Sequence, residues 1–424
     1  MRILKIYMIS KLQNKAKEWL LWSQKYTRTD MLYLAKGGLW LSLGDVISAV
    51  LGLLTAIAFA NLLPQEIYGT YRYILSIAGV LSIASLNRMG TAVTRAVARG
   101  FEGSFVPAVK AQQLWSLLGS IGGLAVAGYY FTQDNNTLTV SFLIVALFIP
   151  LYRPFVTYSS YFSGKKLFNI STRYTIISHA ISAIVLIVVL YLTNNILLIL
   201  LGYFAPLSIS SYTFYRITKS KIQPDSKVSE EALSFGKHLS FLGAITAAIE
   251  QLDKILLWHF LGAASLAIYA FALAPVHQML GFIKLILPLS LPKLAEKTKG
   301  DLKKTLPYKL FIMAGTIGIF VLIYIIAAPL LFKILFPQYI ESVFYSQIFA
   351  LGLLTVPRNL ISEALNAHGE TKKIYILSLT SATFRLPLII ILVGLFGIWG
   401  AIYAYIISSF FSLILSAFLF FKRP

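Results

Sequence analysis

Residues 61–75, NLLPQEIYGTYRYIL, and residues 259–273, HFLGAASLAIYAFAL, are two distant parts of the chain that resemble each other. In the alignment of the two stretches, Tyr71 falls on Tyr269, about 200 residues later. Each stretch runs from the end of one apolar segment into the start of the next. The match predicts that an early helical hairpin recurs in the second half of the chain.

A second pair of segments repeats at a similar offset. Arg153 stands eleven residues before Gly164, and Arg358 stands eleven residues before Gly369. Each match alone is weak, but together they indicate a duplicated transporter with two halves in the same orientation. The predicted organisation is a basic cytoplasmic or interfacial segment at 1–36, a six-helix bundle at 37–215, a cytoplasmic linker at 216–236 and a six-helix bundle at 237–424.

The composition excludes a water-soluble globule. Of the 424 residues, 58% are hydrophobic and 12% charged, against usual values of about 45–50% and 25% in soluble domains. A helix needs roughly 20 apolar residues to cross a bilayer. We therefore predict an all-α polytopic membrane protein, with spans at about 37–61, 67–88, 109–131, 137–160, 171–192, 195–215, 237–260, 263–291, 308–333, 342–364, 373–394 and 398–421. No sequence is left for a sizeable soluble domain.

The net charge of +21 is a topology signal. Counted by alternate links, 29 of the 37 basic residues gather on one side, whereas 132–138 and 193–195 on the other side carry none. By the positive-inside rule, both termini are cytoplasmic, the number of spans is even and the location is the cytoplasmic (inner) membrane. A nucleic-acid partner is not expected. Residues 11–26, KLQNKAKEWLLWSQKY, favour an interfacial helix over a solvated tail.

No enzyme motif is present: the chain has no phosphate-binding glycine loop, no HExxH and no GxSxG, and no cysteine. We therefore expect a transporter, with no cofactor and no metal site. Charges inside the membrane become the functional candidates, because they are costly there and usually face a cavity. Eight basic residues remain after topology is accounted for, against four acidic ones at similar depth: Asp45, Glu250, Asp253 and Glu363. This excess favours an anionic cargo.

The candidate substrate-binding residues are the basic side chains at membrane depth. Arg385 lies near the middle of its helix, too deep to reach the headgroups comfortably. For three others, contact with the lipid headgroups is an equal alternative: Lys284, Arg153 and Arg358. The remaining ones are interpreted as interfacial anchors because they lie near helix ends: Arg72, Arg173 and Lys333.

Carboxylates on the seventh span are candidates for ion coupling. Glu250, Asp253 and Lys254 lie three and four residues apart, which places them on one helix face. They form either an internal ion pair that lowers the cost of burial or a site that exchanges a proton or binds sodium, with Lys254 also a candidate substrate contact. Asp45 is a second coupling candidate. His277 is either a proton relay or a hydrogen-bonded core residue.

Two stretches carry a family resemblance. GLLTAIAFANLLPQEIYGTYRYILSIAGVLSI at 52–83, followed by LNRMGTAVTRAVARG, resembles the first hairpin and loop of polysaccharide-biosynthesis flippases of the Wzx type. IEQLDKILLWHFLGAASLAIYAFALAP at 249–275 resembles the start of their second half, with Asp253, Lys254 and Tyr269 at the positions of a recurrent Asp, basic residue and Tyr.

The resemblance implies a MATE-like fold of the MOP superfamily. It also implies translocation of a polyprenyl-pyrophosphate-linked oligosaccharide from the cytoplasmic to the outer leaflet by alternating access, in the biosynthesis of lipopolysaccharide O-antigen or another surface polysaccharide. The implied partners are membrane lipid, glycosyltransferases and a polysaccharide polymerase.

Several alternatives remain open at this point. A drug or metabolite exporter of the same superfamily is one, although the excess of basic residues disfavours a cationic drug. A peptidoglycan-precursor flippase shares the pyrophosphate. An O-antigen polymerase or ligase is less favoured because the outer links are short. A purely structural subunit is disfavoured by the buried charges.

Overall fold

The computed structural model describes residues 31–223, 225–286 and 298–422, and the predicted interfacial helix at 11–26 lies outside them. Within these ranges, eleven helices are long and apolar enough to cross a membrane. One of them, Glu230–Gly281, has 52 residues, enough for two spans of about 20 residues each. The predicted all-α architecture of about twelve spans is thus confirmed.

The first half supplies six spans from helices of ordinary membrane length. Two of them begin at asparagine caps: the side chain of Asn135 accepts a hydrogen bond from the Leu138 amide, and that of Asn195 from the Leu197 amide. The elements are α2 (Met31–Leu62), α3 (Gln65–Leu81), η1 (Ser82–Ser85), α4 (Met89–Ala98), η2 (Glu102–Ser104), α5 (Phe105–Thr132), α6 (Asn136–Tyr152), η3 (Phe155–Thr157), α7 (Tyr158–Gly164), α8 (Phe168–Leu192) and α9 (Ile196–Lys219).

The second half begins with α10 (Glu230–Ile286), which contains two spans in one continuous assignment. Its backbone leaves the helical region at Gly262, where φ is +81° and a side chain would be strained. The chain turns there, so that the seventh and eighth spans follow each other directly. The remaining elements are α12 (Lys299–Leu335), η5 (Pro337–Tyr339), α13 (Ser342–Leu351), η6 (Gly352–Thr355), α14 (Arg358–Ala367), α15 (Thr371–Phe396) and α16 (Ile398–Phe421).

The fourth and tenth spans are interrupted in the same way. In the fourth, α6 gives way to η3 and then to α7, with Pro154 at the break. In the tenth, α13 gives way to η6 and then to α14, with Pro357 at the break. Proline lacks an amide hydrogen and disrupts the helical ladder, which accounts for both interruptions. Arg153 and Arg358 stand beside these prolines in the two segments that match in sequence.

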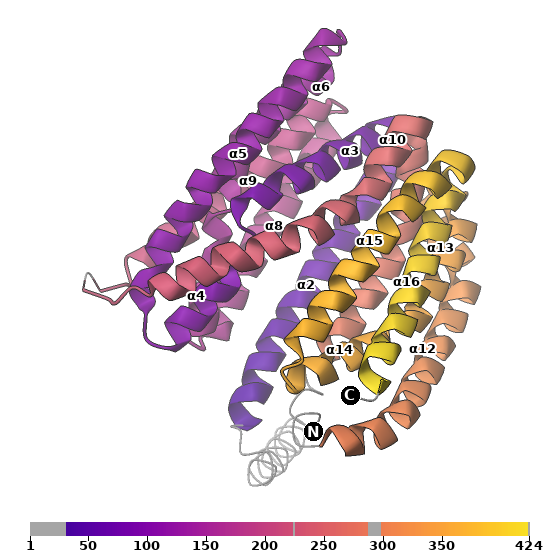
Figure 1. Ribbon diagram of the computed structural model, residues 1–424. Coiled ribbons are helices and arrows are strands. Elements are labelled where there is room, and N and C mark those ends of the chain that lie inside the picture. The colour runs from indigo at the N-terminus through magenta and orange to yellow at the C-terminus, as the bar shows by residue number, and fades with distance from the viewer. Residues whose placement is uncertain (1–30, 224, 287–297, 423–424) are drawn as a thin grey trace, which may run out of the picture.

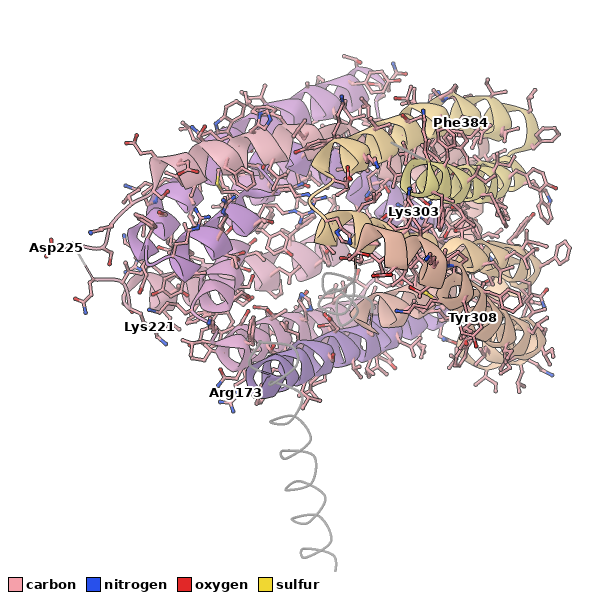
Figure 2. The ribbon with its side chains drawn as sticks, turned by 60° about the horizontal axis from the view of Figure 1, so that its bottom comes forward. Arg173, Lys221, Asp225, Lys303, Tyr308 and Phe384 are labelled. Carbon is pink, nitrogen blue, oxygen red and sulfur yellow. The ribbon has the colours of Figure 1, made fainter. Side chains whose placement is uncertain are left out.

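The two groups of helices lie side by side. Figure 1 shows α5, α6 and α9 at the left and α12, α13, α15 and α16 at the right, with α2, α3 and α10 between them. Helix α10 packs on α3 and α4 of the first half and on α13 and α15 of the second half. The start of α2 and the end of α16 lie at the same end of the bundle, which we name the terminal end. In Figure 2, where this end comes forward, Arg173, Lys221 and Lys303 lie around it.

Polar and aromatic contacts join the two halves at the opposite end. The Asn61 side-chain amide donates to the Leu335 carbonyl at 3.1 Å, and that of Gln65 to the Gln338 carbonyl at 2.7 Å. The rings of Phe271 and Tyr339 lie 3.9 Å apart, and Tyr68 contacts both of them. Gly69 allows the close approach of α3 to α10, because a Cβ there would overlap the Ala263 carbonyl.

Candidate functional sites: two polar cavities

The first cavity has a volume of about 420 Å³ and lies on the terminal side of the contacts that join the halves. Its walls come from α2, α3, α8, α9 and the last residue of α6 in the first half, together with the second part of α10. Its charged or titratable lining side chains are Arg72, His179 and His277. Its aromatic lining residues are Phe59, Tyr68, Tyr71, Tyr152 and Tyr203. The lining combines one guanidinium with many rings.

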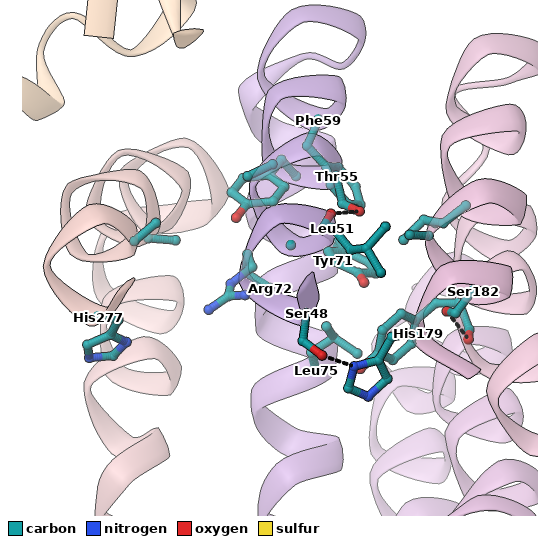
Figure 3. A pocket seen from close by; sticks show the side chains of 18 of the residues that line it. Ser48, Leu51, Thr55, Phe59, Tyr71, Arg72, Leu75, His179, Ser182 and His277 are labelled. Carbon is teal, nitrogen blue, oxygen red and sulfur yellow. Dashed lines mark hydrogen bonds between the residues drawn. The ribbon is translucent and has the colours of Figure 1, made fainter. Parts of the chain in front are cut away.

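Arg72 is the side chain that the sequence interpretation missed. We expected an interfacial anchor from its place near the start of α3, but Arg72 lines the first cavity. Its Nε is buried and has no hydrogen-bond partner. In Figure 3 the guanidinium points from α3 toward the helix that carries His277. The shared alignment position of Tyr71 and Tyr269 was the signal that could have drawn attention to this turn of α3.

Two histidines stand on different walls of the first cavity. His277 of α10 is exposed to the cavity and His179 of α8 lies across from it (Figure 3). The Ser48 hydroxyl lies 3.1 Å from His179 Nδ1, which ties α2 to α8. The structure thus places both histidines in the lining of the first cavity, and of the two only His277 was a candidate from the sequence.

The second cavity has a volume of about 290 Å³ and lies within the second half. It is lined by Arg358 of α14, Arg385 of α15, Glu250 of α10 and Tyr405 of α16. Its remaining polar lining residues are Thr246, Asn359, Ser362, Ser378, Ser381, Ser408, Ser409 and Ser412. Two guanidiniums surrounded by hydroxyl groups form a site that suits an oxyanion.

Both arginines of the second cavity retain hydrogen-bonding capacity. An Nη1 of Arg358 reaches the Ser409 carbonyl only at 3.5 Å. The Nε of Arg385 is buried without a partner, and its Nη2 lies 3.8 Å from Asp253 Oδ2, beyond hydrogen-bond distance. An anion entering the cavity can therefore be bound by these groups without first breaking strong internal bonds.

Asp253 lies at the centre of a buried cluster of charges beside the second cavity. Its side chain is 3% exposed, its Oδ2 accepts a hydrogen bond from the Tyr269 hydroxyl at 2.6 Å, and its Oδ1 lies 3.9 Å from Lys254 Nζ. Arg72 and Arg385 both lie within electrostatic range of Lys254. The cluster is thus placed between the arginine of the first cavity and that of the second, and it brings together the Asp, Lys and Tyr that the sequence singled out.

Glu250 does not share the burial of Asp253 and Lys254. It is exposed and lines the second cavity, and among the described residues its carboxylate forms no ion pair within 4 Å. Lys254 Nζ donates instead to the Glu250 carbonyl at 3.1 Å and to Gln251 Oε1 at 3.0 Å. The expected ion pair is therefore formed by Asp253 and Lys254. Glu250 takes no part in it and lines the second cavity.

Other candidates lie away from both cavities. Arg153 is exposed and lines neither cavity, but its guanidinium lies 5.7 Å from the centre of the ring of Tyr152, which lines the first cavity. Asp45 is exposed on α2 and lines neither cavity. Lys333 and Arg173 are exposed, the latter over Trp40. Lys284 lies on α10, but its side chain is outside the described part of the structure.

The comparison with family models gives a match over most of the chain. The family described as "Polysaccharide biosynthesis protein" matches residues 34–296. The chain belongs to this family. Arg72, Asp253 and Tyr269 lie within the matched region, whereas Arg358 and Arg385 lie beyond it. No curated protein matches the chain.

Solved structures show the same fold at low sequence identity. A MATE in complex with MaD5 aligns with a TM-score of 0.60 and 13% identity, covering 93% of this chain and 97% of that one. A MOP-superfamily transporter from Pyrococcus furiosus aligns with a TM-score of 0.59 and 14% identity, over 92% and 97%. The MATE multidrug transporter DinF-BH gives 0.58 and 15%, over 92% and 97%. This family member is thus a multi-pass membrane protein with the fold of MOP transporters.

Proposed function

We propose that this protein translocates a polyprenyl-pyrophosphate-linked oligosaccharide from the cytoplasmic to the outer leaflet of the cytoplasmic membrane. The observation that carries the proposal is the pair of cavity-lining arginines, Arg72 and Arg385, each with a buried Nε that has no partner. Buried polar groups are normally hydrogen-bonded, so an unpaired guanidinium nitrogen beside a cavity indicates an anionic ligand. Membership of the polysaccharide-biosynthesis family supports a glycan-bearing cargo.

The chemistry of such a cargo explains why two kinds of lining occur. The pyrophosphate and the sugars cannot cross hydrocarbon unaided, whereas the polyprenyl chain stays in it. Arginines bind phosphate oxygens through paired, charge-assisted hydrogen bonds. The rings of Tyr71, Tyr152 and Tyr203 in the first cavity offer flat apolar faces for sugars. The proposed role of the protein is to carry the head group while the chain remains in the bilayer.

The contacts between the halves define the accessible side. They lie at the end opposite the termini, on which the first cavity is closed by Tyr68, Phe271 and Tyr339. With both termini in the cytoplasm, as the basic links require, this conformation receives cargo from the cytoplasm. Separation of these rings and closure at the terminal end would complete an alternating-access cycle.

Ion coupling is assigned to Glu250, with proton or sodium as the coupling ion. Glu250 faces the second cavity together with Arg358 and Arg385, so its negative charge repels an incoming phosphate. Binding of a proton or sodium ion at Glu250 removes that repulsion, so ion binding and phosphate binding are coupled. In this proposal Asp253, held by Tyr269, Lys254 and Arg385, positions these three side chains. His277, which lines the first cavity, is the proposed proton relay.

Complementation of a deletion strain tests the function. Without the gene, lipid-linked oligosaccharide should accumulate on the cytoplasmic leaflet and surface glycan should be lost. Arg72→Gln should fail to restore the glycan at normal protein level, because the cavity loses its guanidinium. The matched control is Arg173→Gln, which removes an exposed arginine that lines neither cavity. Normal surface glycan in the deletion strain would refute the proposal.

An exporter of small molecules is the second candidate, favoured by the fold shared with a MATE multidrug transporter. It predicts drug sensitivity in the deletion strain with unchanged surface glycan. A peptidoglycan-precursor flippase would instead make the gene essential for wall synthesis. Neighbouring genes for glycosyltransferases and a polymerase would support the surface-polysaccharide assignment, including O-antigen of lipopolysaccharide.

A further inference from the structure

An apolar groove lies outside both polar cavities, between α3, η1, α5 and the first part of α10. Its volume is about 530 Å³ and its walls include Leu81, Ile83, Trp115, Leu118, Phe241 and Ile245. Trp115 of α5 and Phe241 of α10 face each other edge to face across it, with ring centres 5.3 Å apart. Leu118, Phe241 and Ile245 are exposed, so the groove opens to the lipid side of the bundle.

The groove continues into the polar interior. A small polar pocket of about 80 Å³ shares Ile83, Ser240 and Ala244 with the groove. The same pocket shares Thr246 and Glu250 with the second cavity. The small pocket therefore lies between the apolar groove and the second cavity, and it borders residues of both.

Arg88 stands at this junction. The Arg88 amide donates to the Ser240 hydroxyl at 3.1 Å, which fixes the bend between η1 and α4 against α10. Its side chain runs along Gly243, where a Cβ would stand 3.4 Å from Arg88 Nε. Arg88 is exposed and, in the part of the chain that the structure describes, has no carboxylate within 4 Å. It supplies a cation where the apolar groove ends.

The groove lies at the depth of the leaflet nearest the termini. Trp115 and Phe241 stand about ten residues after the starts of α5 and α10, which both begin at the terminal end. At a rise of about 1.5 Å per residue, this is roughly 15 Å along the helices, within one leaflet. The groove is thus reached from the leaflet in which cytoplasmic enzymes leave a lipid-linked product.

We propose that this groove binds the first isoprene units of the polyprenyl chain, with Arg88 holding the adjacent phosphate before the head moves to Arg385 and Arg358. This inference rests on the proposed function and names its first binding step. Charge complementarity decides the occupant: an isoprenoid joined directly to a diphosphate places dense negative charge at the end of its chain, where Arg88 stands. A phospholipid acyl chain in the same groove is the competing outcome.

Photolabelling of the wild-type protein tests the groove directly. The protein is placed in phosphatidylcholine nanodiscs with polyprenyl diphosphate that carries a diazirine near the phosphate end of its chain, and labelled residues are identified by mass spectrometry. Label should concentrate on Leu118, Phe241 and Ile245, and excess polyprenyl monophosphate should remove it. Equal competition by phosphatidylglycerol, or label spread evenly over the exposed face of α12, would overturn the proposal.

Two variants with matched controls complete the test. Ala244→Trp fills the groove and should abolish the labelling, whereas Ala125→Trp, at an exposed position of α5 outside the groove, should leave it unchanged. Arg88→Gln should weaken binding of polyprenyl diphosphate about tenfold, since one charge-assisted hydrogen bond is lost. Arg99→Gln is its control. Unchanged binding in both test variants contradicts the groove as the site.

The two proposals fail in distinguishable ways. If the groove assignment alone is wrong, wild-type protein still translocates the lipid-linked oligosaccharide and Ala244→Trp does so at the wild-type rate. If the function is wrong, the deletion strain keeps its normal surface glycan and the wild-type protein does not translocate the lipid-linked oligosaccharide.

Discussion

The two polar cavities occupy equivalent places in the two halves but have different linings. Each is walled by the first, fifth and sixth helices of its own half and by residues beside the break of the fourth. Tyr203 and Tyr405 stand seven residues after the starts of α9 and α16, one in each cavity. Around this shared frame the first cavity carries rings and histidines, and the second carries serines and two arginines. The shared frame and the different linings support a division of work in which both cavities offer arginine to phosphate and only the first offers rings to the sugars.

The largest effect is expected at Asp253, in the buried cluster of charges beside the second cavity. Asp253→Ala leaves the buried Lys254 and the neighbouring Arg385 without their shared carboxylate, at a cost of about 3–5 kcal/mol. Thermal unfolding of the purified protein in detergent should show a large loss of stability. Asp253→Asn, which keeps the shape and the contact with Tyr269, should lose less. Equal stability of Asp253→Ala and wild type would contradict the claim that this cluster stabilises the fold.

A large effect on transport, with little effect on folding, is expected in the second cavity. Arg385→Gln removes a guanidinium whose Nε is unpaired, so affinity for the pyrophosphate should fall about tenfold to a hundredfold. Binding of polyprenyl diphosphate without sugars measures this loss. Arg385→Lys should recover only part of it, since Lys lacks the planar fork that grips two oxygens. Wild-type affinity in Arg385→Gln would contradict the assignment.

A smaller effect, which depends on the sugars, is expected in the first cavity. Tyr203→Leu removes a ring that meets Tyr71 edge to face at 6.0 Å. Affinity for the complete lipid-linked oligosaccharide should fall about twofold to tenfold, as for ring contacts worth about 0.5–1.5 kcal/mol. Affinity for polyprenyl diphosphate alone should stay the same. An equal loss of affinity for polyprenyl diphosphate alone would contradict the claim that the rings of the first cavity bind the sugars.

The smallest effect is expected on the lipid-facing surface. Arg173→Ala removes an exposed guanidinium that lies 5.3 Å from the centre of the Trp40 ring, a contact worth about 0.5–1 kcal/mol. Translocation should continue at the wild-type rate and the unfolding temperature should fall by little. A strong transport defect would show that basic residues outside the cavities also handle the cargo.

The membrane spans could be predicted from the sequence because the length of an apolar segment and the basic residues of a link are local properties. The tight cluster around Asp253 was also within reach, since Asp253, Lys254 and Tyr269 lie on one helical hairpin. Arg385 was recognised because its depth in the membrane can be counted along one helix.

Other features depended on contacts that no local pattern contains. Arg72 was assigned to the interface from its distance to the helix end, but α10 lies opposite and turns that position into a cavity wall. Arg153 and Arg358 match in sequence, yet only Arg358 lines a cavity, whereas the Arg153 guanidinium lies over the ring of Tyr152. Glu250 was grouped with Asp253 by their spacing in the sequence. In the structure, where α15 packs beside α10, Asp253 is buried and Glu250 lines the second cavity.

Translocation in reconstituted vesicles tests the central claim most directly. Purified protein is placed in vesicles with a labelled polyprenyl-pyrophosphate-linked oligosaccharide in one leaflet, and the appearance of its sugars on the other side is measured. Wild type should translocate the cargo, and the double variant Arg72→Gln with Arg385→Gln should reduce the rate to that of protein-free vesicles. Arg173→Gln should behave as wild type. A double variant that translocates at the wild-type rate would contradict the claim that the cavity arginines carry the pyrophosphate.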